Sequence, residues 1–346
     1  MNIKKLLRTL SPAYRVGLRI EDRLAQMPKT GIQEIEDKLN AKMDYYFWLN
    51  QNQPGELLSE TKRRVFAELP PAEGALREFQ LIQARTLSIT ADVCEKHNIP
   101  YFILFGTSLG AVRGKGFIPW DDDIDIGMMR SDYLKFKEAI KDNAFIEVVE
   151  KWNLDSFYRL PKILVKGITH KVAVDIFLYD YLDEKCDPES IWKRQMASRQ
   201  KLMDELSELR LYVPSMTTTE VIPSASIEKK AGEAVEKYNK EFGVQREDGD
   251  TIVWGIDNLT ATGVVRESVY EKSDFFPLKK VVFEGREYLT PRNDLKLLEM
   301  EYGDIWAFPK TPGVIPDLSL QEIQESVAAL NDLLKKQGVE PIHKEQ

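Results

Sequence analysis

The feature that most constrains this chain is a run of alternating acids and isoleucines, Asp121-Asp122-Asp123-Ile124-Asp125-Ile126. Successive side chains of a β-strand point to opposite faces, so this order predicts a half-buried strand over residues 123–128. Asp123 and Asp125 would share one face, roughly 6–7 Å apart along the strand, while both isoleucines face the core. The structural alternative, a solvated acidic turn, seldom alternates strictly with isoleucine.

These acids indicate a site for a hard divalent cation. Like charges held this close raise one another's pKa values unless something positive lies between them, and Mg²⁺ prefers oxygen ligands of this kind. A third acid, Asp175, lies in the segment 171–177, whose apolar residues predict another half-buried strand. If the two strands are neighbours, three carboxylates face one cavity. Otherwise Asp175 is simply paired with a nearby backbone group or a lysine.

Anion-binding groups precede the acids. Gly106-Thr107-Ser108 lies between an expected strand over residues 101–105 and an expected helix over residues 108–113 that is capped by Ser108. Backbone N–H groups, two hydroxyls and the helix N-terminus could together hold a phosphate there. Arg113 and Lys115 connect this turn to the acids and either meet the phosphates of a donor or remain solvated turn residues.

The remaining pattern predicts an α+β protein in which helices flank a mixed or antiparallel sheet. A long helix ends before Pro100, and the connections between the strands expected after residue 145 are too short for parallel crossovers. The expected organisation is a helical N-terminal extension (1–70), a catalytic core (71–185), a helical insertion (186–250) and a C-terminal part with a terminal helix that completes the core (251–346).

Composition narrows the class of protein. A net charge of -8 gives no overall basic surface for long nucleic acid, and the two cysteines are too few for a disulfide framework or a zinc site. We find neither an apolar run of about 20 residues nor a secretory signal, so we expect a cytoplasmic protein. The basic, amphipathic segment 3–10 either packs on the body or a second subunit, or attaches the protein peripherally to an anionic membrane.

Residues 105–136, FGTSLGAVRGKGFIPWDDDIDIGMMRSDYLKF, are similar to the signature of the LicD family, which includes the fukutin-related proteins. The resemblance covers residues 76–180 well and 275–309 more loosely. Ser108 stands where the family usually has leucine, and Gly114 where it often has histidine. Further matching elements are Val174-Asp175-Ile176-Phe177, Phe283-Glu284-Gly285, Pro291 and Tyr302-Gly303-Asp304.

The resemblance implies a nucleotidyltransferase-like fold and a metal site. Gly106 and Thr107 would form the phosphate-binding turn, Asp123 and Asp125 would be paired ligands of Mg²⁺ or Mn²⁺, and Asp175 would be the third acid. Asp121 joins the metal site if the related DxDxD form applies. Asp175 could serve as a base for the acceptor hydroxyl or purely as a ligand.

The family transfers a phosphoalcohol, commonly phosphocholine from CDP-choline or ribitol phosphate from CDP-ribitol, to a hydroxyl of a surface glycan, and CMP leaves. The resemblance therefore implies a CDP-alcohol donor and a glycan acceptor, which could be lipid-linked at the inner face of the cell membrane. Two alternatives stay open. The same acids could transfer a nucleotidyl group to a protein or small molecule, or the chain could be a non-catalytic binding protein with this fold.

Overall fold

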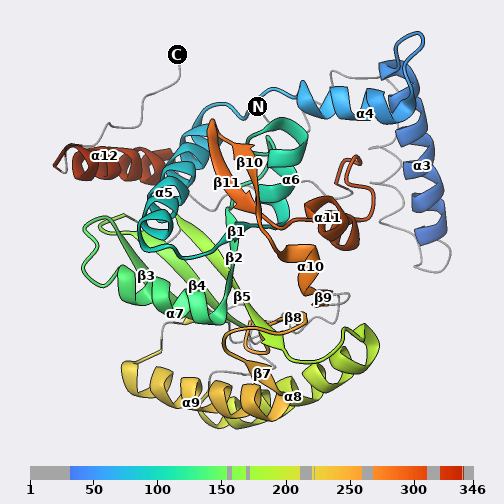
Figure 1. Cartoon of the computed structure of the whole chain (residues 1–346). Coiled ribbons are helices and arrows are strands. Elements are labelled where there is room, and N and C mark those ends of the chain that lie inside the picture. The colour runs from blue at the N-terminus through green and yellow to red at the C-terminus, as the bar shows by residue number, and fades with distance from the viewer. Residues whose placement is uncertain are drawn as a thin grey trace.

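The computed structural model of the protein describes residues 32–153, 158–168, 172–210, 220–221, 223–258, 268–309, 320–336 and 338. Within these ranges the chain forms a nine-stranded mixed sheet and a separate two-stranded sheet, with helices packed around both (Figure 1). The predicted class, α+β with a mixed sheet flanked by helices, is confirmed.

The main path of the large sheet places β2 next to β5 at its centre. These two strands are parallel, and the neighbouring pairs along the path are antiparallel. The order along the path is β1 (Phe102–Ile103), β2 (Asp125–Met129), β5 (Ala173–Leu182), β4 (Tyr158–Val165), β3 (Ile146–Asn153) and β6 (Glu220–Val221). The strands β7 (Val244–Gln245), β8 (Thr251–Trp254) and β9 (Val269–Glu271) extend the far end of β5.

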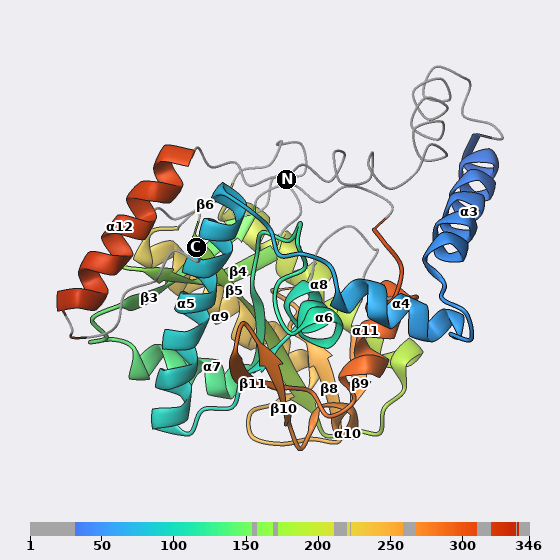
Figure 2. The ribbon, with the colours of Figure 1, turned by 90° about the horizontal axis from the view of Figure 1, so that it is seen from above.

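Helices cover the sheet in separate groups, which two perpendicular views make clear (Figures 1 and 2). On one face, α5 (Ala75–His97) and α7 (Arg130–Ala139) pack against the isoleucines of β2 and β5, and α12 (Leu320–Lys336) packs against α5. The helices α8 (Pro188–Glu208) and α9 (Ala225–Phe242) pair below the sheet around a second core. The remaining helices are α3 (Ile32–Gln51), α4 (Leu58–Ala67), α6 (Phe105–Gly114), α10 (Lys272–Phe275) and α11 (Asp294–Tyr302).

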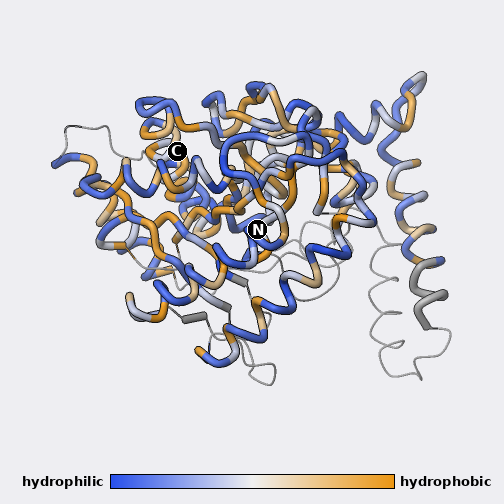
Figure 3. The backbone as a smooth tube through the Cα atoms, turned by 60° about the horizontal axis from the view of Figure 1, so that its bottom comes forward, coloured by the Kyte–Doolittle hydropathy of each residue, from blue (hydrophilic) through white to orange (hydrophobic). Residues whose placement is uncertain are grey.

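Sequence signals explain where these elements end. The helix α5 stops at His97 because Asn98 adopts a left-handed conformation with φ of 53° and its N–H bonds the carbonyls of Cys94 and Glu95. Along the outer helices hydrophilic and hydrophobic positions alternate (Figure 3), as expected for elements with one buried face. None of the described helices combines the length and the apolar character that a membrane span requires.

A tight hairpin fixes the chain just before the acids. The strands β10 (Lys279–Phe283) and β11 (Arg286–Thr290) are joined by Glu284-Gly285, both at positive φ, as a two-residue hairpin turn requires. The Glu284 carboxylate accepts two hydrogen bonds from Arg77 of α5, at 2.9 and 3.1 Å, and a third from the Phe117 N–H at 3.0 Å. The hairpin therefore anchors the loop that leads to Asp121.

A buried ionic network joins the lower half of the molecule to the sheet. Arg130 donates to both oxygens of Asp180 on β5, at 2.7 and 2.8 Å, and to Asp257 at 2.7 Å. Arg159 of β4 bonds the same Asp257 at 3.1 Å and Glu228 of α9 at 3.0 Å. Since each of these charges has a partner of opposite sign, their burial is compensated, and α9 is tied to the core.

Three local predictions were wrong. The strand predicted over residues 123–128 is β2, which begins at Asp125, and all five of its residues are buried because both faces of the sheet are covered here. The helix expected from Ser108 begins at Phe105, so Ser108 lies in its first turn and is not its cap. The strand expected over residues 101–105 is correspondingly short. The basic segment 3–10 lies outside the described residues.

The close approach of β1 to β2 yields a stability test. A Cβ added to Gly127 would lie 2.1 Å from Cε2 of Phe102 and 2.8 Å from Cδ1 of Leu104, so Gly127→Ala forces a buried ring to move. We expect the free energy of unfolding to fall by about 1–3 kcal/mol in urea titrations followed by tryptophan fluorescence. The matched control is Gly232→Ala in α9, where nothing lies within 4 Å of an added Cβ. This control should gain about 0.5–1 kcal/mol, and equal effects at the two positions would contradict the packing argument.

Candidate metal and phosphate site

Two acids meet across the central strand pair. In the parallel pairing of β2 with β5, Asp125 is the direct partner of Asp175, and the Asp175 N–H donates to the Ile124 carbonyl at 2.9 Å. Partners in register present their side chains on the same face of a sheet. The prediction that the two acidic strands are neighbours is therefore confirmed.

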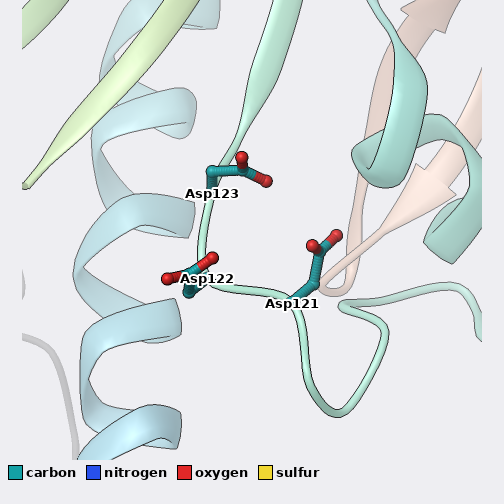
Figure 4. A group of neighbouring side chains, drawn as sticks. All are labelled: Asp121, Asp122 and Asp123. Carbon is teal, nitrogen blue, oxygen red and sulfur yellow. The ribbon is translucent and has the colours of Figure 1, made fainter. Parts of the chain in front are cut away.

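Three further acids lie in the loop that enters β2. One carboxylate oxygen from each of Asp121, Asp122 and Asp123 lies within 4.8 Å of the others. Figure 4 shows Asp122 beside α5, whereas Asp121 lies on the side of α6. Asp123 precedes the strand, so it reaches the site from the loop. The sequence analysis did not assign Asp122 to the site, although it belongs to the same acidic run.

The predicted phosphate turn packs directly on these acids. A Cβ on Gly106 would lie only 2.4 Å from Oδ2 of Asp121, so glycine is needed for this carboxylate to approach α6. The Thr107 hydroxyl accepts a hydrogen bond from the Asp125 N–H at 2.9 Å. Gly106 and Thr107 thus lie at the start of α6 beside two acids. That they bind a phosphate stays a prediction.

Two glutamines of α5 hold the acidic loop, and the sequence analysis missed both. The Gln80 side-chain amide donates to the Asp121 carbonyl at 2.8 Å, and that of Gln83 donates to the Asp122 carbonyl at 3.0 Å. Their signal in the sequence is a pair of glutamines on the buried, largely apolar stripe of α5. Such residues seldom occupy a core position unless they satisfy buried backbone groups.

The electrostatics of the cluster favour binding of a cation. Burial, reinforced by Asp123 and Asp122, raises the pKa of Asp121 to about 8. Burial and the charge of Asp175 raise the pKa of Asp123 to about 6, and burial raises that of Asp125 well above its ordinary value. Oδ2 of Asp121 is buried and has no hydrogen-bond partner among the described residues. An oxygen-rich, strained set of this kind fits Mg²⁺ or Mn²⁺.

The other predicted phosphate ligands lie apart from the acids. Ser108 is buried and its hydroxyl lies 3.5 Å from that of Thr290, so it faces β11. The Arg113 guanidinium donates to the carbonyls of Ile305 and Ala307 at 2.7 and 2.9 Å and stacks 4.1 Å from the Phe66 ring centroid. Burial lowers the pKa of Arg113 to about 10.

Arg113 and Lys115 also line a cavity of about 390 Å³ at the C-terminal end of α6, together with Gly116, Phe117 and Glu284. The structure therefore shows structural contacts for Arg113. Donor binding by Arg113 or Lys115 stays a prediction.

The tertiary structure adds two polar groups that the sequence analysis left without a role. Lys162 of β4 forms an ion pair with Asp175, whose Oδ2 lies 3.0 Å from the Lys162 Nζ. Asp175 thus lies beside the acid cluster and is also paired with a lysine. Tyr302, at the end of α11, lies near the acids, and burial followed by the charge of Asp125 raises the pKa of its hydroxyl.

The part of the chain that holds the acid cluster is similar to known proteins. Residues 98–210 match the model of the LicD/FKTN/FKRP nucleotidyltransferase domain, a range that includes all five acids and Lys162. This part of the chain is therefore similar to LicD-type nucleotidyltransferase domains. The lipopolysaccharide cholinephosphotransferase LicD of Haemophilus influenzae is 26% identical over 257 residues, which are 68% of this chain and 92% of that protein. An uncharacterized protein of Rickettsia typhi is 36% identical over 75 residues, 20% of this chain and 24% of its own.

These similarities support a transferase related to the phosphocholine transferases. The matched range also contains the buried arginines 130 and 159, so the ionic network is built largely from the LicD domain. The residues that close the site from outside this range are Gln80 and Gln83 of α5 and Tyr302 of α11.

Metal binding should require the paired acids of the entering loop and β2. We expect isothermal titration with Mn²⁺ to show lost binding in Asp123→Asn/Asp125→Asn, with no loss of stability in the metal-free protein, because the substitutions remove mutually repelling charges. A matched control is Asp142→Asn/Asp183→Asn, which changes two exposed acids outside the cluster. Unchanged Mn²⁺ affinity in the first variant would refute the site.

Asp121 should make the stability of the metal-free protein depend on pH. The pKa of Asp121 is about 8 in the folded protein, compared with its ordinary value of 3.8. The folded state therefore binds this proton more tightly than the unfolded state, and the protein loses stability as pH rises from about 4 to about 8. In EDTA, Asp121→Asn should match the wild type near pH 4 and exceed it above pH 8, by on the order of 3 kcal/mol in urea unfolding. A difference that does not vary with pH would contradict the assignment.

Proposed function

We propose that this protein transfers a phosphoalcohol, with phosphocholine as the first candidate, from a CDP-activated donor to a hydroxyl of a cell-surface glycan, with release of CMP. The observation that carries the proposal is the match to the Haemophilus influenzae protein, whose name states cholinephosphotransferase activity on lipopolysaccharide and 92% of which the chain covers. The acid cluster supports it, because phosphoryl-type transfer depends on cations held beside a diphosphate.

In this mechanism the acids bind and orient. Asp121, Asp123, Asp125 and Asp175 would hold Mg²⁺ or Mn²⁺, which supplies positive charge against the diphosphate and the leaving CMP. The acceptor oxygen attacks the phosphorus of the phosphoalcohol, the bond from that phosphorus to the CMP oxygen breaks, and the hydroxyl proton passes to a base. Asp175 is our candidate for this base, and a pure ligand role is its alternative.

The donor would lie with its phosphates at the N-terminal end of α6. Gly106 leaves room for a close approach of the chain, and the helix terminus offers partial positive charge to phosphate oxygens. Lys115 would then contact the donor from the C-terminal end of the same helix, because the Ile305 and Ala307 carbonyls already hold Arg113. Ser108 would act only through its packing against Thr290.

An acceptor attached to a lipid would bring the enzyme to the inner face of the membrane. We propose that the basic segment 3–10 makes this contact from the cytoplasm, since basic amphipathic segments bind anionic lipid surfaces. Exposed apolar side chains on α3 and at the start of α4 support the idea, because a monomer rarely exposes several large apolar groups together. These side chains are Tyr45, Tyr46, Leu49, Leu57 and Leu58.

The decisive assay supplies CDP-choline, CDP-ribitol, CTP and ATP separately, each with Mg²⁺ and acceptor glycan, and identifies the released product. We expect CMP from a CDP-alcohol and a mass increase of the glycan by one phosphoalcohol unit. Asp125→Asn should lower kcat by at least about a hundredfold, because a charge beside the transferred group is lost. The Asp142→Asn/Asp183→Asn control should keep full activity. Pyrophosphate released from CTP or ATP, with a nucleotide on the acceptor, would instead establish nucleotidyl transfer.

A further inference from the structure

One lysine completes a row of charged side chains across three adjacent strands. Asp125 of β2 is the register partner of Asp175 of β5, and Asp175 is the register partner of Lys162 of β4. Direct partners in a sheet lie side by side on one face, so the three charges form a line at the same level. Lys162 therefore reaches the acid cluster from the side opposite to α6.

The ion pair of this lysine is largely shielded from water. The side chains of Lys162 and Asp175 retain only 15% and 16% of their exposure, and Nζ lies 3.0 Å from Oδ2 of Asp175. The Lys162 charge also opposes the rise in the pKa values of Asp123 and Asp125. Lys162 thus acts as a counter-charge for the whole cluster and not only for its direct partner.

The arginines Arg113, Arg130 and Arg159 near the cluster already have hydrogen-bond partners. Arg113 is committed to two backbone carbonyls, and Arg130 and Arg159 are committed to the network around Asp257. A diphosphate that enters a group of five acids adds further negative charge, which a single divalent ion does not offset. Lysine is suited to an exchangeable contact, because its compact charge is carried on a flexible stem with three donors.

We propose that Lys162 is an exchangeable counter-ion, which pairs with Asp175 when the site lacks metal and contacts a diphosphate oxygen of the donor when a divalent ion takes its place on Asp175. The inference rests on the proposed function, which supplies the diphosphate. It requires that removal of the lysine changes metal binding and diphosphate binding in opposite directions. A lysine that merely held β4 against β5 would weaken both or change neither.

The test compares the wild type with Lys162→Met, Lys162→Arg and the control Lys166→Met, whose lysine donates to the Asn143 carbonyl outside the cluster. Isothermal titration with Mn²⁺ alone should show about threefold to tenfold tighter binding in Lys162→Met, because a competing cation has left Asp175. Titration with CDP or inorganic pyrophosphate in saturating Mn²⁺ should show binding weakened about tenfold or more. Lys162→Arg should restore most of the diphosphate affinity, and Lys166→Met should match the wild type in every titration.

The outcomes separate the inference from the function on which it rests. If Lys162→Met leaves the Mn²⁺ and diphosphate affinities unchanged, or lowers both, the exchange proposal is overturned even where CDP-choline is turned over normally. If pyrophosphate binding depends on Lys162 while the wild type neither binds CDP nor cleaves a CDP-alcohol, the exchange stands and the proposed function fails. Thermal unfolding of each variant verifies that altered affinity does not reflect lost folding.

Discussion

The parallel pairing of β2 with β5 is the constraint on which the site depends. It sets Asp125 directly beside Asp175 on one face of the sheet and their isoleucine neighbours on the other. The apolar face supplies the burial that holds the strands together, while the acidic face gathers charges that repel one another. Burial of the apolar face thus stabilises a strand pair whose other face carries mutually repelling acids, and a bound cation would relieve that repulsion.

The contacts around the acids serve this arrangement from three directions. Gln80 and Gln83 hold the backbone of the entering loop from α5, Thr107 holds the start of β2 from α6, and the hairpin residue Glu284 fixes the preceding loop through Arg77 and Phe117. None of these groups needs to touch a substrate. Each bonds a backbone group near an acid or the chain leading to it, so the carboxylates are positioned before any ligand arrives, and less ordering remains when one binds.

Much of the architecture could be predicted, since strong local signals agree with the final fold. The long helix α5 and the mixed sheet follow from apolar periodicity and helix stop signals. The errors lie where tertiary contacts override local pattern. β2 is buried on both faces because α6 packs against its acidic side, and α6 begins three residues before the serine that resembled its cap. The alternation of apolar and polar residues along a strand does not indicate whether one or both faces of that strand are covered.

The sequence by itself determined which residues are candidates for the chemistry. The acidic run, the third acid and the glycine turn are local motifs, and their spacing along one strand or turn sets how their side chains lie relative to one another. Only the tertiary structure decided what those residues meet. Lys162 faces Asp175 because of an antiparallel register, Tyr302 approaches from the end of α11, and Arg113 turns to the carbonyls of a distant loop. These partners are separated along the chain, and their pairing is set by how strands and helices pack, which no local period encodes.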